Sequence, residues 1–157
     1  MKNPPITMRL SIRYGDLDPY GHVNNAIHLM FFEEIRLRYW QALADEIGFQ
    51  DLESGDIPGA RYVIAETTIR YKAPIFLDDN LHGAATIQTI GKRSYSMDFE
   101  LRTGDSFENG DLVCEGTAAH VFFDPTSAKV QPRPDWFLPA VAALEGRPEE
   151  SFAQEDR

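Results

Sequence analysis

Alternating apolar and polar side chains mark several stretches of this chain as strands. From residue 8 to residue 14 every second side chain is apolar, which is the pattern of a half-buried strand. Further on, β-branched and aromatic residues or clean alternation predict strands, with turn residues such as Gly91 and Gly104 between them. This close spacing is typical of an antiparallel sheet. The four later strands are expected at residues 62–71, 81–90, 94–102 and 112–123.

A long helical pattern lies between the first expected strand and the second. Asn24 and Asn25 are both good N-cap residues, and Gly48 is a suitable C-cap, so the helix should run to about Ile47. Its first turns are apolar nearly all round except for His28, which predicts that protein surrounds them. The fold class expected is therefore α+β, with a curled antiparallel sheet wrapped around one long central helix.

The length of 157 residues fits a single domain, expected over residues 1–145, followed by a flexible acidic tail over 146–157. A second, short helix is expected at residues 136–144. Because edge strands and one sheet face would need cover, we expect a homodimer or homotetramer.

Charge and composition narrow the classes of function. The formal net charge is −10 and no dense basic stripe is visible, which argues against a nucleic-acid binder. No apolar run approaches the roughly 20 residues that cross a membrane, and the first ten residues lack the apolar core of a signal peptide. The single cysteine, Cys114, is expected in the core and favours a reducing, cytoplasmic location.

The chemically richest segment is DLDPYGHVNNAIH, residues 16–28, where a turn becomes the long helix. It holds two carboxylates, Asp16 and Asp18, with His22 and the two asparagines behind them. A helix N-terminus presents unpaired backbone N–H groups and a partial positive charge. A carboxylate base beside such amides is suited to hydrolysis by acyl transfer.

The run DLDPYGHVNNAIHLMFFEEIR resembles the signature of the hotdog-fold acyl-CoA thioesterases, specifically the 4-hydroxybenzoyl-CoA thioesterase-like family. Its first ten residues are also similar to the catalytic loop of acyl-ACP thioesterases. The resemblance covers about residues 8–124 and implies a hotdog fold. It also implies an enzyme that hydrolyses an acyl- or aroyl-CoA to free acid and CoA, without a metal or an organic cofactor.

The resemblance implies roles for several residues of the loop. Asp18 falls on the catalytic carboxylate, and the backbone N–H of Asn25 falls on the group that polarises the thioester carbonyl. Acyl-ACP relatives add an asparagine and a histidine; here the histidine is kept as His22, whereas Tyr20 replaces the asparagine. Most relatives carry tyrosine where this chain has His28. We therefore expect His22 to support Asp18, and Tyr20 and His28 to shape the substrate site.

A basic turn is the candidate for the nucleotide end of CoA. In the family, a turn between the corresponding strands contacts the CoA phosphates, which implies that role for Lys92, Arg93 and Ser94. Arginine and lysine suit phosphates by charge and donor geometry. The alternative is a solvated hairpin tip with no ligand.

Several alternatives stay open at this point. Asp18 could be a turn former, a general base or a nucleophile. A metal held by the two aspartates and His22 lacks a supporting ligand spacing, and Glu33 or Glu34 could be the helical acid of another thioesterase branch. The protein could also act on acyl-ACP, or bind acyl-CoA without catalysis.

Overall fold

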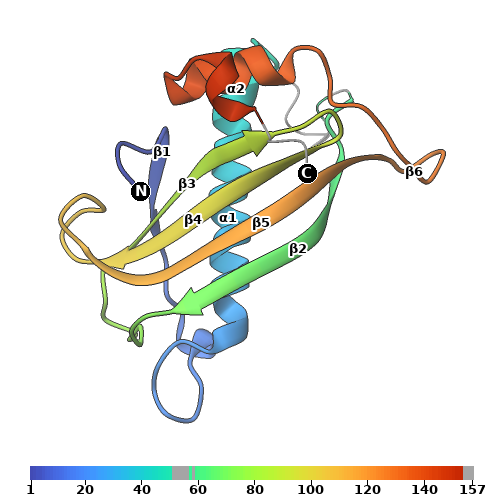
Figure 1. Ribbon diagram of the computed structural model, residues 1–157. Helices are drawn as coiled ribbons and strands as arrows, with labels where there is room; N and C mark the ends of the chain where they lie inside the picture. Colours follow the sequence, from blue (N-terminus) through green and yellow to red (C-terminus); the bar gives the residue numbers. More distant parts are fainter. Residues whose placement is uncertain (51–56, 58, 154–157) are drawn as a thin grey trace.

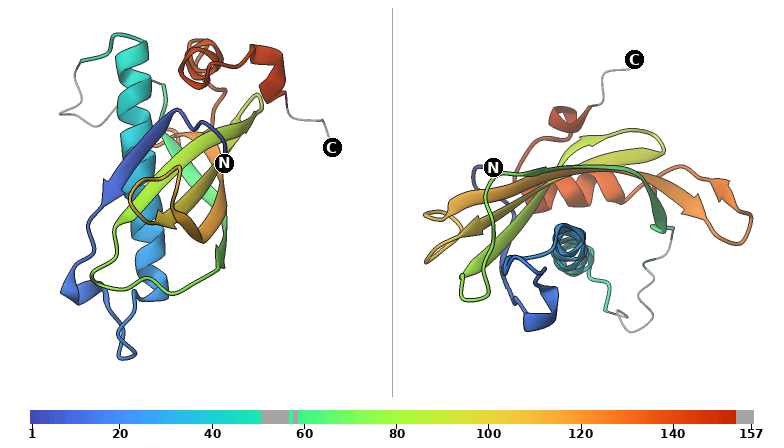
Figure 2. Two further views of the ribbon diagram at one scale, coloured as in Figure 1. Left: turned by 90° about the vertical axis from the view of Figure 1, so that its left-hand side faces the viewer. Right: turned by 90° about the horizontal axis from the view of Figure 1, so that it is seen from below.

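One long helix lies along the concave face of a curved antiparallel sheet (Figure 1), and the right-hand view of Figure 2 looks along that helix beneath the arched sheet. The computed structural model describes residues 1–50, 57 and 59–153. The elements in chain order are β1 (Ile6–Leu10), a 3-10 turn (Tyr14–Asp16), α1 (Asn25–Glu46), β2 (Tyr62–Tyr71), β3 (Leu81–Ile90), β4 (Ser94–Thr103), β5 (Asp111–Asp124), β6 (Lys129–Val130), α2 (Phe137–Glu145) and a second 3-10 turn (Glu149–Phe152).

The strands are ordered β1-β3-β4-β5-β2, and the short β6 pairs with the end of β5. All of these pairs are antiparallel, which confirms the predicted α+β class with an antiparallel sheet. β1 and β2 are therefore the two edges of the main sheet. Register shifts in the β2–β5, β3–β4 and β4–β5 pairs are the kind of irregularity that bends strands and helps a sheet to curl.

α1 confirms the predicted helix at both ends. The Asn24 side chain accepts a hydrogen bond from the Ala26 N–H at 3.0 Å, and Gly48 follows the last turn with a φ of +69°. The helix packs closely on the sheet because glycine lies beneath it. A Cβ at Gly116 would approach Phe32 Cε2 to 2.5 Å, so only glycine allows this contact. The buried side of α1 includes Phe31, Phe32, Ile35, Tyr39 and Leu43.

The outer side of α1 corrects one prediction. Leu29, Met30 and Leu37 are between 47% and 59% exposed, so protein does not surround the first turns within one chain. The sheet covers only one side of the helix. Val63 and Ile64 on the neighbouring edge strand β2 are also exposed, which leaves apolar surface on both elements.

The first strand is shorter than its pattern predicted. β1 ends at Leu10, and Tyr14 lies in a 3-10 turn with most of its side chain exposed. The Arg13 backbone N–H donates to the Asp16 carboxylate at 2.8 Å, and the Arg13 guanidinium also contacts it. These local bonds turn the chain away from the sheet before the alternation of apolar and polar residues ends.

The expected flexible tail is attached over most of its length. Phe152 is buried, and the Arg147 guanidinium lies 4.2 Å from its ring centroid and donates to the Ile87 carbonyl. Residues 146–153 therefore pack against the rest of the chain, while residues 154–157 lie outside the described part. None of the described helices is long and apolar enough to cross a membrane.

Cys114 lies in the core, as predicted. Its side chain is fully buried in β5, and burial raises the pKa of the thiol to about 12. A thiol with such a pKa stays protonated and inert at neutral pH.

Candidate active site

A tight loop connects the first 3-10 turn to α1. Two backbone hydrogen bonds close it, from the Asp18 N–H to the His22 carbonyl at 2.9 Å and from the Asn24 N–H to the Asp16 carbonyl at 2.8 Å. Gly21, with a φ of +84°, supplies the left-handed conformation at the tip. Figure 1 shows this loop directly below the start of α1.

The Asp18 carboxylate is held by two groups of its own loop. Oδ1 accepts the Tyr20 backbone N–H at 2.9 Å, and Oδ2 lies 3.1 Å from Nδ1 of His22. The side chain is only 15% exposed. Each carboxylate oxygen has two lone pairs, so these contacts fix the group and leave it able to accept a further hydrogen bond, for example from water.

Asp16, two residues earlier, has a different environment. Its carboxylate is buried, and both oxygens are bonded by Arg13. Burial raises the pKa of this carboxyl, but the hydrogen bonds from Arg13 outweigh burial and the net pKa lies below its ordinary value. These contacts are those of a residue that holds the loop in shape.

Asn25 is the first residue of α1, so its backbone N–H has no acceptor within the helix. The neighbouring Ala26 N–H is taken by the Asn24 cap. The 22 residues of α1 place the positive end of a long helix dipole at this position. The N–H of Asn25 can therefore act as a hydrogen-bond donor toward a developing negative charge.

His28 is buried one turn into the helix. Its Nδ1 lies 3.2 Å from the Asn24 carbonyl oxygen, and burial lowers the pKa of the ring. Tyr71, the last residue of β2, packs perpendicular to this ring at 4.8 Å and donates its hydroxyl to the Asn25 carbonyl at 3.2 Å. No sequence pattern marks this neighbour, because Tyr71 is separated from the loop by the whole of α1 and β2.

Tyr20 lies near the tip of the loop. Its side chain is 85% exposed, and its ring stacks on that of His22 at a centroid distance of 6.2 Å. The structure thus brings Asp18, His22 and Tyr20 together at the N-terminus of α1.

The predicted basic turn lies at the opposite end of the sheet within one chain. β3 begins at Leu81, which pairs with Leu10 near the loop, and ends at Ile90 just before the turn. Ten strand residues separate the two ends by about 30 Å. Lys92 and Arg93 are exposed and Ser94 opens β4, so one protomer does not combine this turn with Asp18.

Comparison with known proteins places the chain in a family. Residues 12–141 match the thioesterase-like superfamily, which covers most of the chain. The chain belongs to the thioesterase-like superfamily. The resemblance to thioesterases seen in the loop sequence is confirmed.

Similar proteins support this assignment. The long-chain acyl-CoA thioesterase FadM of Escherichia coli is 33% identical over 86 residues, which span 55% of this chain and 61% of FadM. A thioesterase from Thermus thermophilus, solved with coenzyme A and Zn, is 31% identical, with a TM-score of 0.77 and coverage of 94% of this chain and 99% of that one. A 1,4-dihydroxy-2-naphthoyl-CoA thioesterase from Synechocystis is 22% identical with a TM-score of 0.69 over 90% and 98% of the two chains, and this likeness shows the fold alone.

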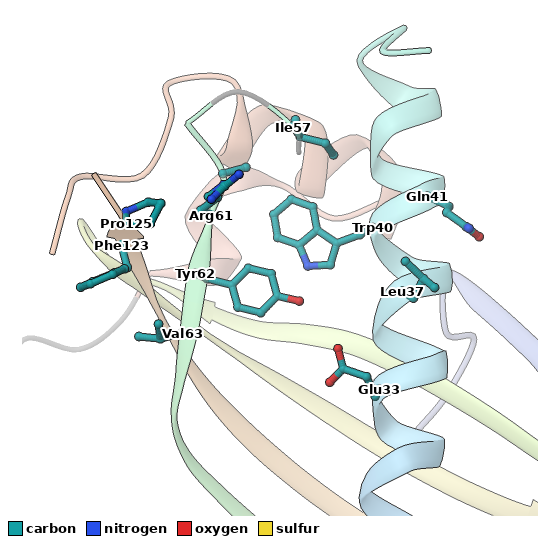
Figure 3. Close-up of a pocket in the computed structure, with 11 residues that line it drawn as sticks. Glu33, Leu37, Trp40, Gln41, Ile57, Arg61, Tyr62, Val63, Phe123 and Pro125 are labelled. Atoms are coloured by element: carbon teal, nitrogen blue, oxygen red, sulfur yellow. The ribbon is translucent and has the colours of Figure 1, made fainter. Parts of the chain in front are cut away.

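This member of the thioesterase-like superfamily also has a groove that its sequence did not predict. The groove, of about 520 Å³, lies between the second half of α1 and the start of β2. Figure 3 shows Trp40 and Tyr62 in its centre, with Leu37 and Val63 at its sides. The Trp40 and Tyr62 rings stack with centroids 5.5 Å apart. The two rings come from elements distant in sequence, so no local motif marks the groove.

Glu33 also lines the groove, and its carboxylate pairs with the buried Arg36. It lies eight residues after Asn25, about 12 Å along the helix. The distance argues against Glu33 as the acid that acts at the helix N-terminus. Among the described residues no three His, Cys, Asp or Glu side chains are grouped to hold a metal ion.

Proposed function

We propose that this protein hydrolyses the thioester bond of an acyl- or aroyl-CoA, giving the free acid and CoA. The observation that carries the proposal is the Asp18 carboxylate, fixed by the Tyr20 N–H and His22 in a loop that leads directly into the N-terminus of α1. Membership of the thioesterase-like superfamily and the similarity to FadM support the same reaction.

In the proposed mechanism the thioester carbonyl oxygen accepts a hydrogen bond from the Asn25 N–H. Asp18 either removes a proton from the attacking water or attacks the carbonyl carbon to give a mixed anhydride that water then cleaves. Negative charge develops on the carbonyl oxygen in both cases, and a donor of this kind can stabilise the transition state by roughly 3–4 kcal/mol. The sulfur leaves as the CoA thiol. His22 orients Asp18, and these groups require no cofactor.

The proposed enzyme is a homo-oligomer built on the β2 edge. β2 is an edge strand that pairs with β5 on one side and with no other described strand on its outer side, and together with α1 it exposes apolar side chains such as Ile64 and Leu37. A second copy paired antiparallel along β2 would cover this surface. A dimer and a tetramer built on this pair are both compatible with it.

The same pairing accounts for the position of the basic turn. Arg93 lies beside the start of β2, because its carbonyl accepts the Phe122 N–H and Phe122 pairs with Tyr62. Antiparallel pairing sets the start of one β2 against the end of the other, where Tyr71 meets Asn25. We propose that Lys92, Arg93 and Ser94 of one subunit bind CoA phosphates at the Asp18 site of its partner, with Tyr20 and His28 shaping the substrate site.

CoA is the proposed carrier rather than acyl carrier protein, and the proposed location is the cytoplasm. The clustered cations at residues 92–93 suit the phosphates of CoA on an otherwise acidic protein. The free thiol of Cys114, buried in β5, is consistent with a reducing compartment.

The test is a panel of acyl-CoA substrates, short, long and aromatic, assayed for release of free CoA thiol. The proposal expects turnover of at least one of them and loss of that turnover in Asp18→Asn. The same acyl group is presented on acyl carrier protein in parallel. Faster cleavage of the carrier-protein substrate would overturn the choice of CoA, and no thiol release from any substrate would favour a binding module.

A further inference from the structure

The peptide group between Asn24 and Asn25 offers a hydrogen-bonding group on each side. Its N–H is the donor proposed above for the thioester oxygen. Its carbonyl oxygen, that of Asn24, accepts the Ile27 N–H at 2.9 Å and lies 3.2 Å from Nδ1 of His28. His28 is 3% exposed, so this contact is shielded from water.

The chemistry of the contact defines the state of the His28 ring. A carbonyl oxygen only accepts hydrogen bonds, so Nδ1 must carry the proton and donate it to the Asn24 oxygen. The ring is neutral at pH 7, because burial lowers its pKa from an ordinary value that already lies below 7. The bond is therefore present in the range in which the enzyme would work.

Hydrogen bonds in a chain polarise one another. When an amide carbonyl accepts a hydrogen bond, electron density moves toward its oxygen and its own N–H becomes a stronger donor. His28 is thus connected, through one peptide group, to the atom proposed to stabilise the oxyanion. The bond also limits rotation of this peptide, which keeps the Asn25 N–H aligned with the helix axis.

We propose that His28 is a positioning residue of the active site, which orients the peptide between Asn24 and Asn25 and strengthens its N–H as the oxyanion donor. The inference rests on the proposed function. It replaces a general role of His28 in shaping the substrate site with a specific role of its Nδ1 atom. A side chain in this position without a donor at the place of Nδ1 does not make the bond to the Asn24 carbonyl.

Tyr71 offers a matched control. Its hydroxyl donates to the Asn25 carbonyl, which belongs to the next peptide group and not to the one that carries the Asn25 N–H. Tyr71→Phe removes this bond and keeps the ring that packs on His28. Loss of the His28 ring and Tyr71→Phe each delete a bond of 3.2 Å, the first to the Asn24 carbonyl and the second to the Asn25 carbonyl. Only the Asn24 carbonyl belongs to the peptide that carries the proposed donor.

The first experiment compares three replacements of His28 in the complete protein. His28→Asn keeps an N–H donor at the place of Nδ1, His28→Gln moves the donor to the place of Nε2, and His28→Leu removes it. We expect the Gln and Leu variants to lower kcat about three- to tenfold with little change in KM, as for one hydrogen bond acting indirectly. His28→Asn should retain most of kcat, and Tyr71→Phe should lower it less than His28→Leu.

The second experiment measures the donor directly and does not depend on turnover. An acyl-CoA with a ¹³C-labelled thioester carbonyl is bound to Asp18→Asn, and the carbonyl stretching frequency is read by infrared difference spectroscopy. A strong donor lowers this frequency. We expect the lowering to shrink when His28→Leu is added and to persist when Tyr71→Phe is added instead.

The outcomes separate the inference from the function on which it rests. Undiminished turnover in Asp18→Asn would overturn the proposed function. Loss of turnover in Asp18→Asn, with kcat and the carbonyl frequency unchanged by His28→Leu, would overturn the role of His28 alone. Equal losses in His28→Asn and His28→Leu would also overturn it, because the shape of the ring and not its Nδ1 donor would then be the cause. Thermal unfolding of each variant ensures that only folded protein is compared.

Discussion

The two ends of α1 organise their polar groups in opposite ways. At the N-terminal end, the polar side chains of the loop find partners within a few residues, as Asp18 does with Tyr20 and His22. Toward the C-terminal end, Trp40 belongs to a cluster of rings from four other elements: Tyr62 of β2, Tyr95 of β4, His120 and Phe122 of β5, and Phe137 of α2. Within the described residues, several polar atoms near this cluster have no hydrogen-bond partner: Arg36 Nε, Trp40 Nε1, the Tyr95 hydroxyl and both ring nitrogens of His120.

The contrast indicates that the loop serves the proposed reaction and that the ring cluster serves the stability of the fold. The loop is exposed at its tip and holds the carboxylate proposed to react, whereas the cluster buries large rings at the cost of unpaired polar atoms. His120 is the clearest case: it stacks on Tyr95 at 4.4 Å, and burial lowers its pKa to about 3. Substitutions in the loop should therefore change turnover, and substitutions in the cluster should change the free energy of unfolding.

The largest expected effect in the cluster follows from removing its central ring. Trp40→Ala deletes contacts with Tyr62, Tyr95 and Phe137, and should lower the free energy of unfolding by about 3–5 kcal/mol. Urea denaturation followed by circular dichroism measures this change. Trp40→Phe, which retains an aromatic ring, should lose clearly less. Equal stability of the Ala variant and the natural chain would break the division of roles.

The second prediction concerns the pH dependence of the free energy of unfolding. Folded His120 stays neutral down to about pH 3, whereas in the unfolded chain it gains a proton below about pH 6.5. The unfolded state thus binds more protons between these values, so stability is full above pH 6.5 and falls as the pH is lowered, by at most about 1.4 kcal/mol per pH unit.

His120→Phe removes this dependence and the two unpaired nitrogens. We expect the variant to be more stable by about 1 kcal/mol at pH 7, and its advantage to widen by roughly 1–3 kcal/mol at pH 4. Denaturation at both pH values tests this difference. If the difference in the free energy of unfolding between the two chains were the same at both pH values, His120 would not be held neutral in the folded state.

The third effect lies in the loop. His22→Phe keeps a ring that can stack on Tyr20 but removes the nitrogen beside Asp18, and should lower kcat about tenfold, the size of one charge-assisted hydrogen bond. The free energy of unfolding should hardly change, since His22 is about one-third exposed. Partial recovery of kcat in His22→Asn would show that the Nδ1 contact with Asp18 is the part of His22 that matters. A large loss of stability in His22→Phe would contradict this role.

The smallest effect concerns the basic turn, which lies at the same end of the sheet as the cluster. Substituting both cations, Lys92→Ala with Arg93→Ala, should raise KM for an acyl-CoA several-fold by removing phosphate contacts. The same acyl group on pantetheine, without the nucleotide, serves as the control and should show no change. Equal KM changes for both substrates would indicate that the turn acts only on structure.

The sequence allowed accurate prediction of several features that depend on neighbours along the chain. The ends of α1 follow from the Asn24 cap and Gly48, and the four later strands follow from alternation and turn residues. The grouping of Asp18 with His22 is equally local. Where local bonds compete with the pattern, prediction failed: alternation up to Tyr14 predicted a strand, but the bonds between Arg13 and Asp16 end it early.

Contacts between segments distant in the chain could not be predicted from the sequence. The groove depends on Trp40 meeting Tyr62 across two elements, and the position of His28 depends on Tyr71 at the end of β2. The attachment of the C-terminal segment similarly depends on Arg147 reaching β3. A single sequence carries no signal for such pairs, because each partner taken alone has the pattern of an ordinary core or surface residue.

The central claim is that Asp18 performs the chemistry while Asp16, two residues away, maintains the loop. The most direct measurement compares kcat and thermal stability of Asp18→Asn and Asp16→Asn on one acyl-CoA substrate, at a temperature at which both are folded. We predict that Asp18→Asn loses turnover by a factor of about 10³, the scale of a transition-state contribution of several kcal/mol, with its stability nearly unchanged. Asp16→Asn should lose stability and retain most of its turnover. Near-normal turnover in Asp18→Asn, or the larger loss of kcat in Asp16→Asn, would contradict the account.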